Sequence, residues 1–578
     1  MLVQSLLLTA LSILSLSPAS SGTVSSSSSS SPSSSSVNAQ YSNLLGDALW
    51  FYEAQRSGKL PSDNRVSWRN DSALQDGSDN GLDLSGGYYD AGDYLKATYP
   101  LCWTMTSLAW SALSYGQAYV RSGQDAYLDR TLRWGMDWLI RANPDKDTLY
   151  VLVGDPDVDN QYWGGDQGIP NPRPSYKIDR INPGTDAFAS CSSAFAATSY
   201  LYGGGGNNSL PVQQPGQVDP SETLGGVPTI QDADYSSTLL RHASDLWELA
   251  TTTTKRQRYQ VAQPVVSKIY PSTDYQDDLV LSSLWMALAT ANRTYSEAAE
   301  TFYDQAQPAF PYNQGPLNWD QKAPALPILA SQISLASNQL GLSFSKYQSD
   351  SEVWLDSLVS GKMTNTFTTP KGLLWFDGDS DPASLNPSLN SAFLISLYRS
   401  LASNPAKTKA YSDFADSQID YVLGSGNGYN GPFVVGVHPN SPSNPHSAMA
   451  SGGQDITKIN TSPPTEINTL YGALIGGPDR KDRFFDLRDD YPQTEVALDY
   501  NAPLVAITLY RLSTSTDDPP YGLPEDEAYP SSSHGLSKGA KIAIAVIVVV
   551  VFFSLLGALA WWRREWLRRS YRLRKLGL

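Results

Sequence analysis

Residues 95–116, "LKATYPLCWTMTSLAWSALSYG", are apolar around the whole circumference of the helix that their spacing predicts. Residues 187–203, "AFASCSSAFAATSYLYG", have the same character. Helices that are apolar on every face are buried between other helices. The sequence therefore predicts a helical protein in which these two segments lie inside.

Helical spacing recurs between about residues 40 and 515 and predicts twelve helices. Twelve helices fit six helical hairpins closed into a ring, and they fit a large open bundle as well. Long loops at 61–93, 144–185, 203–232 and 424–493 are rich in aromatic residues, Gly and Asp, so we expect them to form the walls of a binding site. The expected helices lie near 45–57, 94–122, 126–143, 186–202, 233–254, 274–292, 294–306, 322–338, 350–362, 386–404, 406–423 and 494–513.

The two ends of the chain do not have the composition of a folded domain. Residues 1–21 resemble a signal peptide and residues 22–38 form a Ser-rich, low-complexity spacer. After the domain at 39–515, a polar stalk at 516–539 leads to a predicted transmembrane helix at 540–562. The basic tail at 563–578 indicates that the chain's C-terminus is cytoplasmic. We therefore expect a single-pass type I plasma-membrane protein with an extracellular domain and membrane lipid around its span.

Charge and cysteine content narrow the partners and the compartment. The net charge of −16 argues against nucleic acid as a partner, and no protein partner is evident from the sequence. The two cysteines, Cys102 and Cys191, are either joined by a disulfide or buried as free thiols. Four Asn-x-Ser/Thr sequons predict glycosylation at Asn70, Asn207, Asn292 and Asn460.

Carboxylates stand out in two places. In "GGYYDAGDYLK", residues 86–96, Asp90 and Asp93 lie three apart among glycines and tyrosines. Glu495 is expected in the first turn of the last helix, where the helix dipole would favour its ionised form. Taken alone, the aspartates could form a turn or bind calcium, and Glu495 could be an ordinary first-turn acid. Paired carboxylates beside aromatic residues also indicate glycoside hydrolysis, which uses two acids flanking the bond.

Four blocks resemble glycoside hydrolase family nine, the cellulase family E, in family order: 65–96, 152–186, 420–427 and 471–506. The resemblance implies an all-α fold, an (α/α)6 barrel of twelve helices. It implies an endo-β-1,4-glucanase that acts on β-glucan with inversion and needs no cofactor. By the same resemblance, Asp93 is the general base, Asp90 helps to hold the water, and Glu495 is the general acid.

The resemblance also implies substrate-binding side chains, and the sequence departs from the family pattern near two of them. In "PSNPHSAMASGG", residues 442–453, His446 matches the family's first His, but Ser447 and Ala448 replace a His and an Arg. In the block at 152–186, Asp159-Asn160 stands where the family has Asp-His, so Asn160 replaces a further His. Arg488 is expected to be structural, and the Asp-rich loops permit a structural calcium. The expected substrate-binding residues are His446, Trp163, Tyr88, Tyr500, Trp319 and Trp375.

These departures leave two alternatives to the glucanase. One is a catalytically weak, membrane-anchored protein that binds glucan. The other keeps the same ring of helices but hydrolyses a different β-glycan, such as glucomannan or a chitosan-like polymer.

Overall fold

The computed structural model describes residues 37–204, 208–213, 224–306 and 314–521. The expected signal peptide, the transmembrane helix, the basic tail, residues 522–539 of the stalk and Asn207 lie outside these ranges. Within them, no helix is both long enough and apolar enough to cross a bilayer.

Twelve helices of 12 to 20 residues dominate the described ranges. Most begin and end within a few residues of the predicted positions. Three of the larger differences are six residues each: α1 starts at Ala39 rather than 45, α12 starts at Phe344 rather than 350, and α13 ends at Tyr398 rather than 404. The predicted helix at 94–122 divides at Gly116 into α2 and the short α3 (Gln117–Ser122). The twelve are α1 (Ala39–Ala54), α2 (Thr98–Tyr115), α4 (Asp125–Ala142), α6 (Thr185–Tyr202), α7 (Ala233–Thr252), α9 (Gln276–Thr290), α10 (Arg293–Ala306), α11 (Ala325–Ala336), α12 (Phe344–Val359), α13 (Leu385–Tyr398), α14 (Pro405–Val422) and α17 (Leu498–Thr514).

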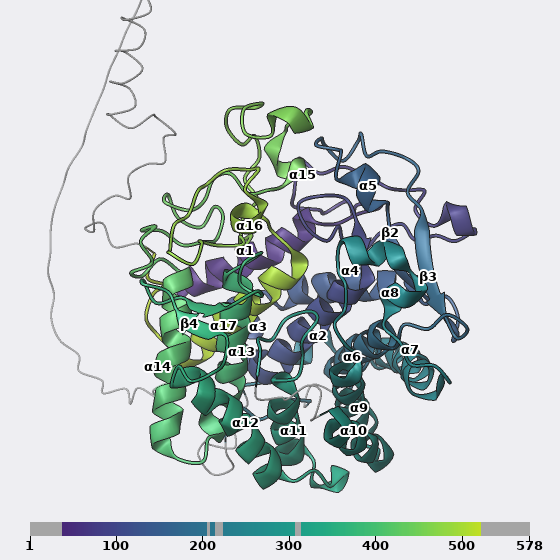
Figure 1. The fold of residues 1–578 in the computed structure, drawn as a ribbon, viewed down its shortest axis with the longest axis vertical. Coiled ribbons are helices and arrows are strands. Elements are labelled where there is room, and N and C mark those ends of the chain that lie inside the picture. The colour runs from purple at the N-terminus through teal and green to yellow at the C-terminus, as the bar shows by residue number, and fades with distance from the viewer. Residues whose placement is uncertain (1–36, 205–207, 214–223, 307–313, 522–578) are drawn as a thin grey trace, which may run out of the picture. The chain divides into compact units, whose positions relative to one another are not determined.

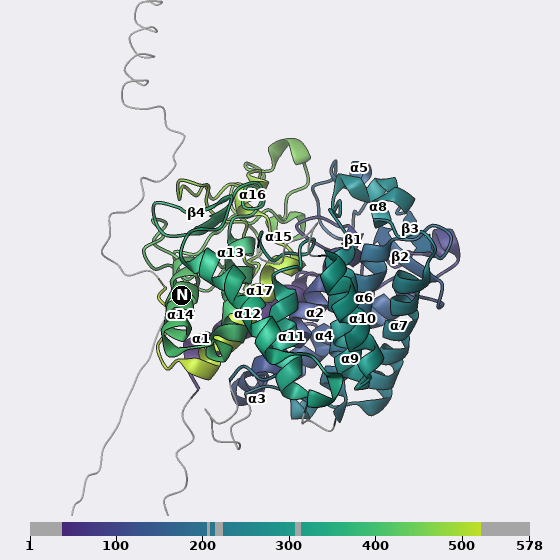
Figure 2. The ribbon, with the colours of Figure 1, turned by 60° about the horizontal axis from the view of Figure 1, so that its bottom comes forward.

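Every second long helix lies inside. All residues of α2 and α13 are buried, whereas α4, α7 and α10 bury one face each. The inner helices contact one another in the order α2, α6, α9, α11, α13, α17 and back to α2. This closed order distinguishes a ring from an open bundle. It is consistent with the expected (α/α)6 barrel (Figures 1 and 2).

Short elements that the sequence did not predict lie in the connections. β1 (Lys96–Ala97), β2 (Thr148–Val153) and β3 (Ser175–Asp179) form an antiparallel sheet in that order, and β4 (Thr366–Thr368) pairs with β5 (Leu374–Phe376). The short helices are α5 (Pro156–Asp159), α8 (Tyr259–Ala262), α15 (Ala448–Ser451) and α16 (Tyr491–Thr494).

The direction of the helices decides where the loops lie. Each connection from an outer to the next inner helix ends at the N-terminus of that inner helix, and the loops of 55–97, 143–184 and 423–497 are all of this kind. The loop at 203–232 connects inner α6 to outer α7, and its described residues lie at the opposite end. There, the backbone amides of Leu210 and Gly226 donate to Leu113 and Ala112 near the end of α2. Our expectation that 203–232 lines the same site was therefore wrong.

Two contacts fix the ends and the interior of the domain. A disulfide joins Cys102 on α2 to Cys191 on α6, two neighbouring inner helices. The side-chain amide of Asn38 donates to the carbonyl oxygens of Thr516 and Asp517 and to the carboxylate of Asp518. The first residues of the expected stalk thus lie against the domain.

Candidate active site

Hydrogen bonds to backbone groups of the loop that carries Asp90 and Asp93 hold this loop in place. The amide of Asp90 donates to the carbonyl of Leu95 at 2.9 Å. The carbonyl of Asp90 accepts from the amide of Leu498, the first residue of α17, at 3.0 Å. The side-chain amide of Gln55, next to α1, donates to the carbonyl of Ala91 at 2.6 Å. This loop therefore joins the first and last helices of the domain.

A second segment brings Glu495 to the same place. Residues 446 and 495 form a parallel bridge, in which the His446 amide donates to the carbonyl of Thr494 at 2.8 Å. The Ala448 amide donates to the carbonyl of Gly92 at 2.8 Å. Three segments that are far apart in the sequence are thus joined by backbone hydrogen bonds, and each carries a residue of the expected site.

We expected Glu495 in the first turn of the last helix, but it lies before that helix begins. It is extended (φ −61°, ψ 147°), and so is Ala497 (φ −148°, ψ 158°), so that α17 begins only at Leu498. The helix dipole therefore does not fix its charge state. Burial dominates, together with the charge of Asp90, and raises the pKa of Glu495 to about 8.

Gly92 is required where the loop of Asp90 and Asp93 touches the His446 segment. A Cβ at Gly92 would lie 1.9 Å from the carbonyl oxygen of His446, which no side chain can occupy. We expect Gly92→Ala to separate the two segments and to lower kcat/KM by about 100-fold or more, since small displacements of catalytic groups have effects of that size. Steady-state hydrolysis of cellotetraose measures this. Gly165→Ala, whose Cβ would have its closest neighbour at 4.0 Å, is the control and should retain normal activity.

Five carboxyl groups gather here, and we call them the carboxyl cluster: Asp90, Asp93, Asp159, Glu495 and Asp499. Within the described ranges, no Lys or Arg forms an ion pair with any of them. Burial is the largest cause of each pKa shift, and neighbouring acids add to it for every member except Asp159. Burial raises the pKa of Asp159 although its hydrogen bonds with Tyr94 and Asp93 and the charge of Arg173 lower it. Burial also raises the pKa of Asp90 to about 8 and that of Asp499 to about 7, and the pKa of Asp93 lies well above its ordinary value. The cluster therefore retains protons at neutral pH.

Asp90 is oriented by a tyrosine. The phenol of Tyr270 donates to Oδ2 of Asp90. Oδ1 of Asp90 is buried and has no hydrogen-bond partner among the described residues. A buried carboxyl oxygen without a partner is costly, and a water or a substrate hydroxyl would satisfy it.

These shifts predict that acid stabilises the fold. A carboxyl whose pKa is raised in the folded state binds more protons than in the unfolded chain, so its stabilisation is complete below about pH 4 and is lost as the pH rises through about 8. Between pH 5 and 7, Glu495 alone should lower the free energy of unfolding by up to about 1.4 kcal/mol per pH unit. Denaturant unfolding of the wild type and of Glu495→Gln at pH 5, 6 and 7 measures this. Equal slopes for the two proteins would contradict the raised pKa of Glu495.

Three of the expected substrate-binding side chains adjoin the carboxyl cluster. The ring of Trp319 lies edge-on to Tyr270, with centroids 4.8 Å apart. Burial raises the pKa of Tyr500 well above its ordinary value, and the nearby charges of Glu495, Asp499 and Asp90 add to the shift. Nδ1 of His446 donates to the carbonyl of Arg488, and burial lowers the pKa of His446, so the ring is neutral with Nε2 as an acceptor.

Two other expectations were wrong because both rings are buried. Tyr88 is 1% exposed and its phenol donates to the carbonyl of Thr131 on α4, on the core side of the loop. Trp163 is 4% exposed and packs with Tyr89, Tyr94, Ala448 and Met449, beside His446. Neither ring has a free face for a sugar.

Trp375, another expected substrate-binding residue, is buried but also lines a pocket. It is 2% exposed and packs on Phe367, yet it lines a pocket of about 350 Å³ together with Pro492 and Gln493. Pro492 and Gln493 belong to α16, which ends at Thr494, immediately before Glu495.

The residues that depart from the family pattern have structural surroundings of their own. Ser447 caps α15, accepting from the Ala450 amide at 3.3 Å, and both Ser447 and Ala448 are buried. Asn160 is exposed at the end of α5. The guanidinium of Arg488 donates to the carbonyls of Ile459 and Pro463, in keeping with the structural role expected for it.

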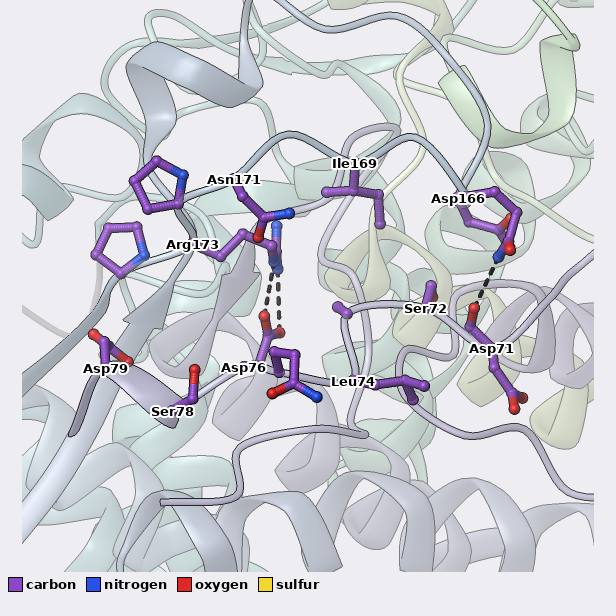
Figure 3. A pocket seen from close by; sticks show the side chains of 15 residues that line it. Asp71, Ser72, Leu74, Asp76, Ser78, Asp79, Asp166, Ile169, Asn171 and Arg173 are labelled. Carbon is purple, nitrogen blue, oxygen red and sulfur yellow. Dashed lines mark hydrogen bonds and ion pairs between the residues drawn. The ribbon is translucent and has the colours of Figure 1, made fainter. Parts of the chain in front are cut away.

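A pocket of about 560 Å³ is lined by residues of the stretches 71–79 and 166–174 (Figure 3). On its wall, Arg173 is paired with Asp76 at 2.8 Å, and Asp76 is paired with the buried Lys96 at 2.6 Å. Lys96 also donates to the carbonyl of Leu84 at 2.7 Å. Asp76 thus bridges Arg173 on the pocket wall and Lys96, which lies three residues after Asp93.

The sequence did not single out Tyr270, Asp159 or Asp499 as site residues. Asp499 lies only four residues after Glu495, and Asp159 precedes the departure at Asn160, so both were within blocks already quoted. Tyr270 lies in a connection with no motif, and only the fold places it on Asp90. Among the described residues, no group of three or more His, Cys, Asp or Glu side chains is placed to hold a metal ion, so a structural calcium is unconfirmed.

Comparisons with known proteins agree with this arrangement. The family model described as "Glycosyl hydrolase family 9" matches residues 41–508. "Endoglucanase 10" of Arabidopsis thaliana is 33% identical over 506 residues, which cover 83% of this chain and 89% of that protein. "Endoglucanase A" of Bacillus pumilus is 34% identical over 465 residues, which cover 80% of this chain but only 64% of that longer protein.

Solved structures show the same fold. An endoglucanase from the termite Nasutitermes takasagoensis, determined at pH 2.5, is 33% identical with a TM-score of 0.68 and covers 82% of this chain and 98% of its own. Endoglucanase CelQ from Clostridium thermocellum, complexed with cellobiose and cellotriose, is 29% identical with a TM-score of 0.68 and covers 85% of this chain and 74% of its own. The extent of the family match establishes the conclusion: this chain belongs to glycosyl hydrolase family 9, and it is a glycoside hydrolase.

Proposed function

We propose that the protein is an endo-β-1,4-glucanase that hydrolyses internal bonds of cellulose-like glucans with inversion at the anomeric carbon. One observation supports this above others. Backbone hydrogen bonds join the loop of Asp90 and Asp93 to the segment of Glu495, and the carboxyl groups between them are buried and hold protons. The printed names of the relatives and the cello-oligosaccharides held by CelQ support the choice of glucan.

Each carboxyl has a distinct part in the proposed reaction. Protonated Glu495 gives its proton to the glycosidic oxygen as the bond from that oxygen to the anomeric carbon breaks. A water attacks the same carbon from the opposite face, and its proton passes to ionised Asp93. Asp90, held by Tyr270, accepts a hydrogen bond from that water through Oδ1. Exchange with solvent then returns a proton to Glu495 and removes one from Asp93.

The burial of Glu495 suits a general acid at neutral pH. An ordinary glutamic acid is ionised there and has no proton to give, whereas a pKa of about 8 keeps Glu495 protonated. Asp93 must lose its proton before each turnover. Burial and the adjacent Asp159 raise the pKa of Asp93 well above its ordinary value, so its carboxylate readily takes up a proton once it is ionised.

The proposal is tested with the full chain on soluble carboxymethyl cellulose, mixed-linkage glucan, glucomannan and chitosan. Release of reducing ends together with an early fall in viscosity is expected on the first two. Release mainly from glucomannan or chitosan would replace the substrate, and release from none of the four would overturn the proposal.

The surroundings of Ser447 and Ala448 favour a second candidate, a glucan-binding protein with weak hydrolysis. Both positions are buried here, so the His and Arg side chains that the family pattern has there are replaced by a helix cap and a core methyl group. Binding of cellotetraose by a well-folded wild type that releases no reducing ends would select this candidate.

We also propose that the domain is extracellular and tethered by residues 540–562. The uncharged run of 21 residues, Ile542–Trp562, and the basic tail after it support a single span. The disulfide between Cys102 and Cys191 fits an oxidising compartment. The sequons at Asn70 and Asn292 are exposed. In sealed vesicles whose cytoplasmic face is inside, the C-terminal tail is expected to be protected from protease. Glycan on Asn70 or Asn292 would agree with an extracellular domain.

A further inference from the structure

A fully buried lysine, Lys322, lies where the N-terminal ends of the inner helices α2, α9 and α11 meet. Nζ of Lys322, three residues before α11, lies 2.9 Å from Oδ1 of Asp278, in the first turn of α9, and neither side chain is exposed. Lys322 also donates to the phenol of Tyr99, in the first turn of α2, at 2.8 Å, and that phenol donates to Oδ2 of Asp278 at 2.6 Å. This closed triangle of ammonium, carboxylate and phenol joins α2, α9 and α11, and none of its members belongs to the carboxyl cluster.

The same lysine anchors the turn that carries Trp319. Its backbone amide donates to Oδ2 of Asp277 at 2.6 Å. Two residues earlier, Asp320 accepts from the amide and the hydroxyl of Thr273 at 2.8 and 2.7 Å. Trp319 thus directly precedes a pair of anchored residues on a loop that is otherwise irregular.

From this turn, ring contacts lead to the site. Tyr99 meets Trp319 edge-on, with centroids 5.8 Å apart at 83°, and Trp319 meets Tyr270 edge-on, at 4.8 Å and 84°. The phenol of Tyr270 then donates to Asp90. Edge-to-face rings fix each other's orientation, so a shift of Tyr99 or of the Trp319 turn would move the donor of Asp90.

We propose that Lys322 is a positioning residue for the glucanase reaction: by tying Tyr99 to Asp278 it sets Trp319 and Tyr270, and through Tyr270 it holds Asp90 in its reactive orientation. This inference rests on the proposed function, because the effect is read from hydrolysis. Lys322 touches neither the substrate path nor a reacting atom, and it acts through Trp319 and Tyr270.

Charge explains why a lysine is needed here rather than an apolar residue. Asp277 and Asp278 are adjacent and both are buried. Removing the ammonium leaves two buried acids without their cation, and the phenol of Tyr99 then loses one of its two partners. The triangle would open at the point where Tyr99 supports Trp319.

A double-mutant cycle tests the proposal. Lys322→Met, Tyr270→Phe and the double variant are prepared as full chains, and kcat and KM are measured on cellotetraose. We expect Lys322→Met to lower kcat by about tenfold or more in the wild type. In the Tyr270→Phe background it should lower kcat by less than about threefold, because the contact through which it acts is already absent.

Controls separate positioning from folding. Lys409→Met, which removes an exposed lysine paired with Asp413, should leave both constants unchanged. If Lys322→Met does not fold, Tyr99→Phe replaces it, because it keeps the ring against Trp319 and removes only the hydroxyl that joins Lys322 to Asp278. The same non-additive loss in kcat is expected.

Two results would overturn the proposal. One is an equal loss of kcat in both backgrounds, and the other is a lowered melting temperature with normal kcat. A wild type without hydrolytic activity would instead remove the proposed function itself, and the wild-type rate, measured first, distinguishes that failure from a failure of the positioning role.

Discussion

Asp93→Asn is expected to lower kcat on cellotetraose by about 10³-fold, within the range that general-base catalysis contributes. Asparagine keeps the shape of the side chain but cannot take the proton of the attacking water. Binding should change little, because the shorter hydrogen bonds of this loop involve Asp90, Ala91 and Gly92. The side chain of Asp93 accepts a long bond of 3.4 Å from the Leu95 amide, which the Oδ1 of asparagine can also accept. Steady-state kinetics together with calorimetric titration of cellotetraose measure both quantities.

The matched control for Asp93→Asn is Asp83→Asn. Asp83 lies on the same loop, is well exposed and pairs with Arg141 at 3.3 Å, and its loss should leave kcat unchanged. A small anion should also restore part of the activity of Asp93→Gly, because it can enter the space of the missing carboxylate. Retention of more than a tenth of wild-type kcat by Asp93→Asn would remove Asp93 from the role of base.

Glu495→Gln is expected to lose activity to a degree that depends on the leaving group. On cellotetraose the departing sugar alcohol needs a proton, and we expect a loss of about 10³-fold in kcat. On a dinitrophenyl cellotrioside the departing phenolate needs none, so the loss should be below about tenfold. Rates of the same variant on the two substrates measure the contribution of protonation directly.

The two variants control each other. Asp93→Asn removes activation of water, which both substrates require, so it should be slow on both. If Glu495→Gln were equally slow on both substrates, Glu495 would act on the attacking water or on the fold, and the roles of the two carboxyls would have to be exchanged or abandoned.

The helices were the most predictable part of the fold, for a physical reason. Segments such as 95–116 and 187–203 are apolar on every face, which both identifies a helix and places it inside. The short strands could not be predicted in this way. β1 has only two residues, and it is a strand because β2 lies beside it. Closure of the ring also depends on contacts between helices that are distant in the chain.

The site was predictable where identity and motif suffice, and not where orientation decides. Asp90, Asp93 and Glu495 were named from the sequence, and the fold gathers them. In "GYYD" nothing distinguishes Tyr88, whose phenol faces α4, from Tyr89, whose phenol donates to Ser72 at 2.9 Å. The charge state of Glu495 was misjudged because Glu495 is itself extended and two residues separate it from the helix whose dipole was expected to act on it.

The central claim is that Asp93 and Glu495 act from opposite faces of the anomeric carbon. The configuration of the first product tests this claim most directly. Proton NMR during hydrolysis of cellohexaose by the full chain resolves the anomeric signals before mutarotation mixes them. Inversion predicts that the newly formed reducing end appears first as the α-anomer and only later as the equilibrium mixture. A reducing end that appears first as the β-anomer would show retention, which these two carboxyls in these roles cannot produce.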